Sequence, residues 1–122
     1  MWNYADVKEY CKDSKDVEQV LAYIKPIPDT EDITASPQEF FSRGGGDCED
    51  YANAVYHLLA DRGYEVKMYR LEDDTNIAHR VCTYSKDNDN GIFSNSNRFS
   101  DVSISEYLFG TDWSLARALN EF

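Results

Sequence analysis

The chain has 122 residues, of which 42% are apolar, and carries a formal net charge of −11. This length fits a single domain over residues 1–122, and the apolar share is ordinary for a globular protein. A charge this negative predicts repulsion of DNA and RNA, so we expect no nucleic-acid partner. The sequence has no apolar run long enough to cross a membrane, and we expect a protein or peptide partner of basic character.

The three cysteines, Cys11, Cys48 and Cys82, are widely spaced and form no CxxC pair. Their number and spacing argue against a zinc site and against a disulfide scaffold. The first residues lack the basic region and apolar core of a secretory signal. A reducing, cytoplasmic compartment is therefore the expectation.

The first half of the chain is predicted to be helical. Apolar residues recur at helical spacing over residues 3–12 and again over residues 17–24, where Ser14 is the expected N-cap and Pro26 ends the helix. The tetrapeptide at residues 36–39 places a serine cap before a proline and completes a capping box with Glu39. It predicts a third, short helix that ends at Gly44.

The longest predicted helix covers residues 48–62, with Asp47 as N-cap, Asp50 as its capping-box partner and Gly63 as the stop. After Gly63 the apolar period changes to two, which predicts strands over residues 64–69, 77–84 and 92–95. A further extended piece is expected over residues 99–102, then a brief helix after Ser103 and a last helix after residues 111–112. This order predicts an α+β fold with helices packed on one side of a small antiparallel sheet.

Cys48 is the residue in this sequence best placed for chemistry. Three glycines precede Asp47, so Cys48 takes the first position of the long helix. The free N–H groups and the positive dipole end there stabilise a thiolate, and the same N–H groups can stabilise an oxyanion. A buried structural cysteine after a glycine-rich turn is the alternative interpretation.

A cysteine nucleophile needs a base within hydrogen-bond reach, and the chain has two histidines. His57 lies nine residues along the same helix, about 13.5 Å away at 1.5 Å per residue, and is therefore excluded. His79 lies in a predicted strand that the fold can bring to the start of the helix. It is the candidate base.

Together these residues resemble the bacterial transglutaminase-like cysteine proteinases, within the wider transglutaminase-like and papain-like superfamily. The resemblance rests on the serine-proline helix start at 36–41, the motif Gly-Asp-Cys-Glu-Asp-Tyr-Ala at 46–52, and His79 in a following strand. It covers residues 30–95, about half of the chain. It implies a papain- or transglutaminase-like core with the nucleophile at a helix N-terminus.

The resemblance also implies a Cys-His-Asp triad, with Cys48 as nucleophile and His79 as base. The third member would stand at the start of a pair resembling Asp-Asn on the next strand, where this sequence has Ser94 and Asn95. Asparagine can orient the histidine without adding charge, and serine does so more weakly. A working Cys-His-Asn variant, a slow Cys-His dyad and an inactive site remain open. Asp87 and Asp89 could substitute only if their hairpin bends back.

Acidic residues flank the cysteine and disfavour a thiolate by like-charge repulsion. Some relatives use such acids to bind calcium, so Asp47 and Glu49 are candidate calcium ligands by resemblance. Capping and surface charge are the alternative explanation, and no cofactor is otherwise expected.

These observations predict a thiol hydrolase of the cysteine peptidase type. It would cleave or transfer an amide or peptide acyl group through Cys48 and His79, with Ser94 and Asn95 as candidates for the third role. The alternative is a catalytically impaired binding module that engages a basic protein through its acidic surface.

Overall fold

The computed structural model describes residues 3–28, 34–75 and 77–119. Four helices form its first half: α1 (Tyr4–Tyr10), α2 (Ser14–Leu21), α3 (Pro37–Arg43) and α4 (Cys48–Ala60). Ser36 caps α3 through the amide of Glu39, as the sequence predicts. The cap of α2 differs from the prediction, because Asp13 accepts the capping bond and Ser14 is the first helical residue.

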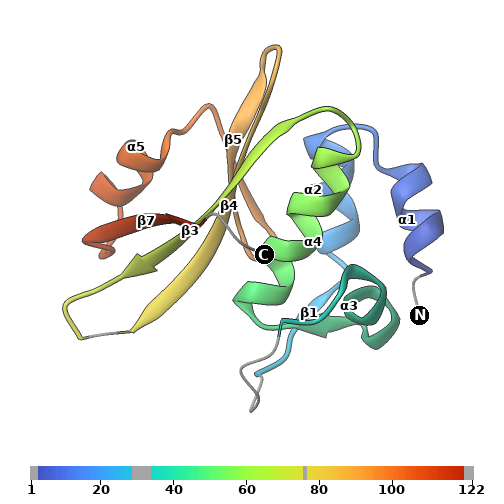
Figure 1. Ribbon diagram of the computed structural model, residues 1–122, viewed down its shortest axis with the longest axis horizontal. Helices are drawn as coiled ribbons and strands as arrows, with labels where there is room; N and C mark the ends of the chain where they lie inside the picture. Colours follow the sequence, from blue (N-terminus) through green and yellow to red (C-terminus); the bar gives the residue numbers. More distant parts are fainter. Residues whose placement is uncertain (1–2, 29–33, 76, 120–122) are drawn as a thin grey trace.

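The second half is an antiparallel sheet of five strands in the order β6-β5-β4-β3-β7. Its strands are β3 (Glu65–Glu72), β4 (Ala78–Lys86), β5 (Asp89–Ser94), β6 (Asn97–Ser100) and β7 (Leu115–Leu119). The three central strands and the extended piece after them confirm the prediction from the period of two. Figure 1 shows α1 to α4 gathered on one side of this sheet.

The predicted last helix is wrong. Residues 115–119 form β7, which pairs with β3 so that Arg117 lies opposite Arg70. Five residues rich in leucine and alanine suit either structure, and pairing with an open sheet edge overrides the weak helical preference. The expected brief helix after Ser103 is present as α5 (Ile104–Phe109), with a complete capping box.

Two apolar clusters hold the layers together. The larger one joins the helices to one face of the sheet through α4, Met68 of β3 and Cys82 of β4. The smaller one lies on the opposite face, where Tyr107 of α5 packs against Leu71, Val81 and Ile92. The fold is therefore α+β as predicted, with α5 added on the face that α4 does not cover (Figure 1).

A short parallel pair, β1 (Lys25–Pro26) and β2 (Gly45–Gly46), leads into α4. A Cβ at Gly45 would lie 2.0 Å from the carbonyl oxygen of Lys25, and one at Gly46 would lie 2.4 Å from the Asp50 carboxylate. Only glycine permits these approaches. The two glycines of β2 therefore allow the backbone to pass close to β1 on one side and to the first turn of α4 on the other.

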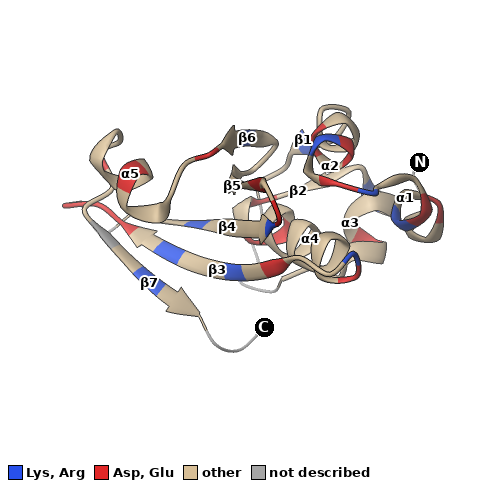
Figure 2. Ribbon diagram, turned by 90° about the horizontal axis from the view of Figure 1, so that it is seen from above, with Lys and Arg blue, Asp and Glu red and all other residues tan. Residues whose placement is uncertain are grey.

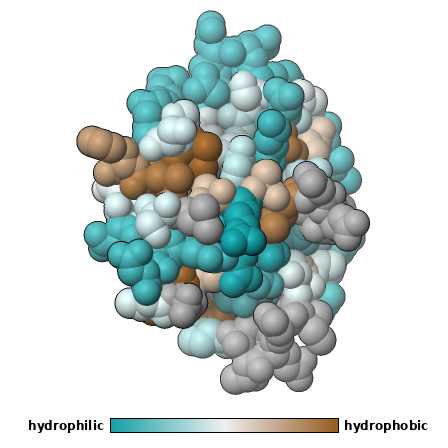
Figure 3. Space-filling view, turned by 60° about the vertical axis from the view of Figure 1, so that its left-hand side comes forward, coloured by the Kyte–Doolittle hydropathy of each residue, from teal (hydrophilic) through white to brown (hydrophobic). Residues whose placement is uncertain are grey.

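The end of the molecule that carries α5 presents mostly hydrophilic side chains, with smaller apolar areas between them (Figure 3). Among the described helices, none has the length and apolar character that crossing a membrane requires.

Candidate active site

The start of α4 is fixed by reciprocal capping. Asp47 accepts a hydrogen bond from the amide of Asp50 at 3.1 Å, and Asp50 accepts one from the amide of Asp47 at 3.1 Å. Asp50 is fully buried and also accepts a hydrogen bond from the amide of Ala35 at 2.7 Å. Asn53 donates to the carbonyl of Ala35 at 3.3 Å. Two side chains of α4 therefore hold the segment before α3 beside the cysteine.

Cys48 occupies the first position of α4 and is half-buried. The backbone N–H of Arg80 lies near enough to the Cys48 sulfur to act on the pKa of the thiol. Burial raises the pKa of the thiol, and the charges of Asp47 and Glu49 raise it further, while the Arg80 amide and guanidinium oppose them. Burial and the flanking carboxylates therefore outweigh the groups that stabilise a thiolate at the start of the helix.

His79 belongs to β4 and is held from two sides. Its Nε2 lies 2.8 Å from Oγ of Ser94 on the neighbouring strand. The indole of Trp113 stacks on its ring, with centroids 5.5 Å apart and planes 13° apart. Burial lowers the pKa of this imidazole from its ordinary value, which favours the neutral form.

Arg80 connects the two groups, since it follows His79 in the chain and its backbone N–H and charge act on the Cys48 thiol. Within the described residues no hydrogen bond joins Cys48 to His79 directly. Ser94 occupies Nε2, which leaves Nδ1 as the nitrogen available for the cysteine. Contacts of this kind often tighten only when a substrate binds.

Among the described residues, no hydrogen bond joins Asn95 to His79. Asn95 takes a left-handed conformation, with φ of 52°, in the turn after β5. Its side-chain oxygen is buried and makes no hydrogen bond with a described residue. Of the two candidates for the third role, the structure therefore brings Ser94 to the histidine.

The aspartates of the β4–β5 hairpin lie away from the site. Asp89 accepts hydrogen bonds from the hydroxyl of Ser14 at 2.6 Å and from that of Tyr64. Asp89 is the first residue of β5 and Ser94 is the last, so the two lie at opposite ends of the strand. Asp89 pairs in register with Lys86. The hairpin does not bend back, and Asp89 ties α2 to the sheet instead.

Asp47 and Glu49 do not fit a calcium site. Asp47 is engaged in the capping box, while Glu49 accepts a hydrogen bond from Thr34 at 3.1 Å and lies 3.9 Å from the Arg80 guanidinium. Calcium takes six to eight oxygen ligands and disfavours a nearby cation. Over the described ranges, no three His, Cys, Asp or Glu side chains gather closely enough to hold a metal ion.

No protein-family model matches the sequence, and no curated protein sequence matches it. Solved structures do match the fold. LapG from Legionella pneumophila, a transglutaminase-like cysteine protease, superimposes with a TM-score of 0.65 at 20% identity, over 96% of this chain and 72% of LapG. This chain has a transglutaminase-like fold.

Two further structures agree. The calcium-bound form of LapG gives a TM-score of 0.62 at 21% identity, over 96% of this chain and 72% of that protein. A Cytophaga hutchinsonii protein assigned as a cysteine protease gives 0.55 at 12% identity, over 96% of this chain and 43% of its own. These structures confirm the fold that the resemblance implies. Calcium is bound by that LapG structure, whereas Asp47 and Glu49 of this chain are otherwise engaged.

Two residues of the site escaped the sequence analysis. Arg80 could have been noticed because it follows the candidate base directly. Trp113 had no such signal, because its contact with His79 depends on the path of the chain after α5.

Proposed function

We propose that this protein is a thiol hydrolase of the cysteine peptidase type, acting on an amide or peptide bond. Cys48 is the nucleophile, His79 the general base and acid, and Ser94 the residue that orients His79. The observation that carries the proposal is that the backbone N–H of Arg80 acts on the Cys48 sulfur while Ser94 holds the neighbouring His79. The thiol therefore lies near the residue next to an imidazole that is already oriented.

In the first step the Cys48 thiol gives its proton to Nδ1 of His79 while the sulfur bonds to the acyl carbon. The oxygen gains negative charge there, and the free N–H of Cys48 at the start of α4 stabilises it. The C–N bond then breaks, and the leaving amine takes the proton from His79. Water attacks the thioester, gives a proton to His79, and the sulfur leaves as the thiol when that proton returns.

This scheme starts from neutral groups. Burial disfavours the charged form of both Cys48 and His79, so a resting thiolate–imidazolium pair is not favoured. Ser94 fixes the ring without adding the negative charge that a carboxylate would supply. The proposal is therefore a slow enzyme whose proton transfer accompanies nucleophilic attack.

Peptide turnover tests the proposal. The wild-type protein is incubated with an internally quenched peptide library, alongside Cys48→Ala and His79→Gln. Cleavage that both substitutions abolish supports it, whereas equal cleavage by Cys48→Ala contradicts it. Cys82→Ala is less suitable as a control because that residue is fully buried; Ser85→Ala, on an exposed position of β4, is suitable.

A catalytically impaired binding module is the second candidate. The raised pKa of Cys48 favours it, since an unactivated thiol is what a non-catalytic relative would retain. Such a module would engage a basic partner through its acidic surface. Iodoacetamide labelling of Cys48 that is unchanged in His79→Gln, together with no peptide turnover, would favour this candidate.

A further inference from the structure

Three arginines lie side by side across the sheet. Arg80 of β4 pairs in register with Arg70 of β3, which pairs in register with Arg117 of β7. All three share the face that α4 covers, because Arg80 and Arg70 are each two residues from Cys82 and Met68 in the larger core. We call these residues the arginine row. Figure 2 shows the basic segments of the three strands next to one another.

The arginine row is expected to lower the stability of the fold. Like charges directly opposite each other on neighbouring strands repel, and this chain has only 12 basic residues against 23 acidic ones. Within the described residues, two carboxylates lie near the three guanidinium groups. Glu72 lies 3.2 Å from Nε of Arg70 and 3.9 Å from Nε of Arg117, and Glu49 lies 3.9 Å from Nη1 of Arg80.

The outer part of the row is open to a ligand. The side chains of Arg70 and Arg117 are 49% and 65% exposed. Both face Glu72 through Nε, and among the described residues their terminal nitrogens make no hydrogen bond. A guanidinium bound in this way keeps the planar pair of terminal nitrogens that binds a carboxylate through two parallel bonds.

The inner end of the row, Arg80, lies next to the candidate nucleophile Cys48. The backbone N–H and the charge of Arg80 both act on the Cys48 thiol, and the Arg80 guanidinium lies 3.9 Å from Glu49, the residue after Cys48. Neighbouring strands are about 4.8 Å apart. Counted from Arg80, Arg70 therefore lies about 5 Å away across the sheet and Arg117 about 10 Å away. An extended peptide advances about 3.3 Å per residue, so an acidic side chain within about three residues of the scissile bond reaches the row.

We propose that the arginine row is a substrate-recognition site that selects peptides with an aspartate or glutamate within about three residues of the bond that Cys48 attacks. This proposal rests on the proposed hydrolase function and adds its substrate class. It differs from the basic partner expected from the net charge, which stays a proposal for the acidic surface away from the row. Distant acidic side chains are screened over about 8 Å at physiological salt.

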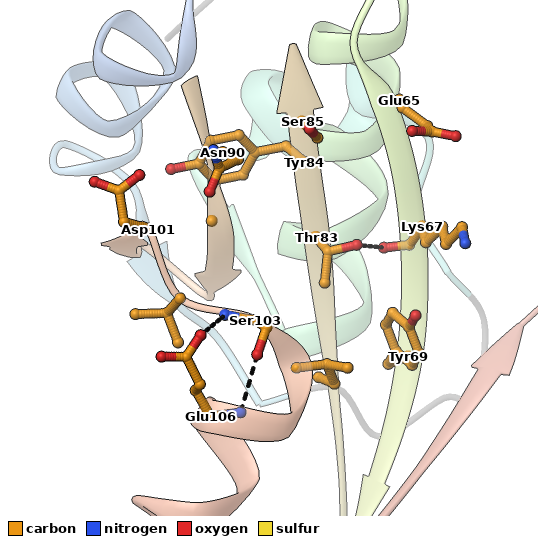
Figure 4. A pocket seen from close by; sticks show the side chains of 13 residues that line it. Glu65, Lys67, Tyr69, Thr83, Tyr84, Ser85, Asn90, Asp101, Ser103 and Glu106 are labelled. Carbon is orange, nitrogen blue, oxygen red and sulfur yellow. Dashed lines mark hydrogen bonds between the residues drawn. The ribbon is translucent and has the colours of Figure 1, made fainter. Parts of the chain in front are cut away.

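The matched control is Lys67. It lies on β3 only three residues before Arg70, but on the opposite face, where it lines an open pocket beside α5 (Figure 4). Lys67→Gln removes the same charge from the same strand without touching the row. Glu72→Gln is the reciprocal variant, since it removes the carboxylate that Arg70 and Arg117 share.

The first measurement is independent of peptidase activity. Iodoacetate and iodoacetamide are similar in size, but only iodoacetate carries a negative charge. The rate of Cys48 alkylation by iodoacetate divided by the rate by iodoacetamide therefore reports attraction of an anion. The thiolate fraction of Cys48 affects both rates equally and cancels in this ratio. We expect this ratio to fall about threefold in the double variant Arg70→Gln/Arg117→Gln, to rise in Glu72→Gln, and to stay within experimental error in Lys67→Gln. A ratio equal in the double variant and Lys67→Gln would overturn the anion site.

The second measurement uses an internally quenched peptide library with paired Glu and Gln at each position. We expect kcat/KM at least tenfold higher for glutamate at one position near the scissile bond, and loss of this preference in the double arginine variant alone. Cleavage without that preference would overturn the substrate class and leave the hydrolase standing. Absence of any cleavage would overturn the hydrolase and with it this substrate class, and a positive alkylation result would then describe an anion site only.

Discussion

The hydroxyl of Ser94 lies 2.8 Å from Nε2 of His79, in the place where the resemblance to transglutaminase-like proteinases implies a carboxylate. The contact joins β5 to β4 beyond the last paired residues of the two strands, Cys82 and Phe93. A hydroxyl orients the ring but cannot stabilise its protonated form by charge. The properties of this site should therefore differ from those of a charged triad in both rate and pH dependence.

Replacement of Ser94 tests this difference. Ser94→Ala removes a hydrogen bond worth about 0.5–1.5 kcal/mol, so we expect kcat/KM to fall about 2- to 10-fold. Ser94→Asp adds the missing charge, and we expect an increase of about tenfold at pH 8. Peptide turnover measures both, with Ser85→Ala as the control on the exposed part of β4.

The pH profile should change with the same substitution. In the wild type, burial lowers the pKa of His79, so the neutral base persists below the ordinary value of 6.5 and activity falls only at more acidic pH. The carboxylate in Ser94→Asp favours the imidazolium and raises that pKa. Its acidic limb should therefore lie at higher pH than that of the wild type, and an unshifted limb would show that residue 94 does not act on His79.

Trp113 should set the environment of His79. Its ring stacks on the imidazole and contributes to the burial that lowers the histidine pKa. We expect Trp113→Ala to raise this pKa toward 6.5 and to lower kcat/KM, whereas Trp113→Phe should retain most of the effect. The pKa is measured by NMR titration of the His79 ring. Phe109→Ala, at an apolar position that is 95% exposed, is the control and should leave the titration unchanged.

Glu49 should restrain the nucleophile. Its charge raises the pKa of Cys48, and its ion pair with Arg80 partly neutralises a cation that lowers it. We expect Glu49→Gln to lower this pKa and to increase the rate of iodoacetamide labelling at pH 8 by about 2- to 5-fold. Mass spectrometry of peptides locates the label at Cys48. Glu65→Gln, on the other face of the sheet, should label at the wild-type rate.

Asp89 should matter for stability and not for catalysis. It accepts hydrogen bonds from Ser14 and Tyr64, and these lower its pKa although burial acts to raise it. We expect Asp89→Asn to reduce the free energy of unfolding at pH 7 by about 1–3 kcal/mol. Urea denaturation measures this loss, and Asp87→Asn, in the same hairpin, should cost less than half as much.

The same contacts fix the sign of the pH dependence. Because the pKa of Asp89 is lower in the folded state, its contribution is fully present above the usual value of 3.8 and is lost as pH falls through the folded value. The difference in stability between the wild type and Asp89→Asn should therefore shrink below about pH 4. A constant difference would mean that the carboxylate charge is not involved.

Local signals in the sequence predicted the elements that carry the site. The capping box of Asp47 and Asp50 defines the first turn of α4, and the serine-proline start defines α3, because both act within four residues. The alternation of apolar residues likewise predicted β3 to β5, although the pair Asn90 and Gly91, which is typical of a hairpin turn, lies within β5 and the turn falls at residues 87–88. Such features need no knowledge of the tertiary structure.

Features that depend on long-range pairing could not be predicted in this way. Residues 115–119 are a strand because the edge of β3 is available to them, and the row formed by Arg70, Arg80 and Arg117 exists only in that register. The raised pKa of Cys48 likewise follows from burial, which the sequence does not specify. The start of α4 does act to lower the pKa of Cys48, but burial and the flanking carboxylates raise it by more.

The central claim is that Cys48 forms an acyl bond with His79 as its base. Intact-protein mass spectrometry after brief exposure to an activated acyl ester tests it most directly. We predict a single acyl adduct on Cys48 that Cys48→Ala lacks and that His79→Gln forms at least 100-fold more slowly. An adduct that forms on Cys48 at the same rate in His79→Gln, or that appears on other residues instead, would contradict the account.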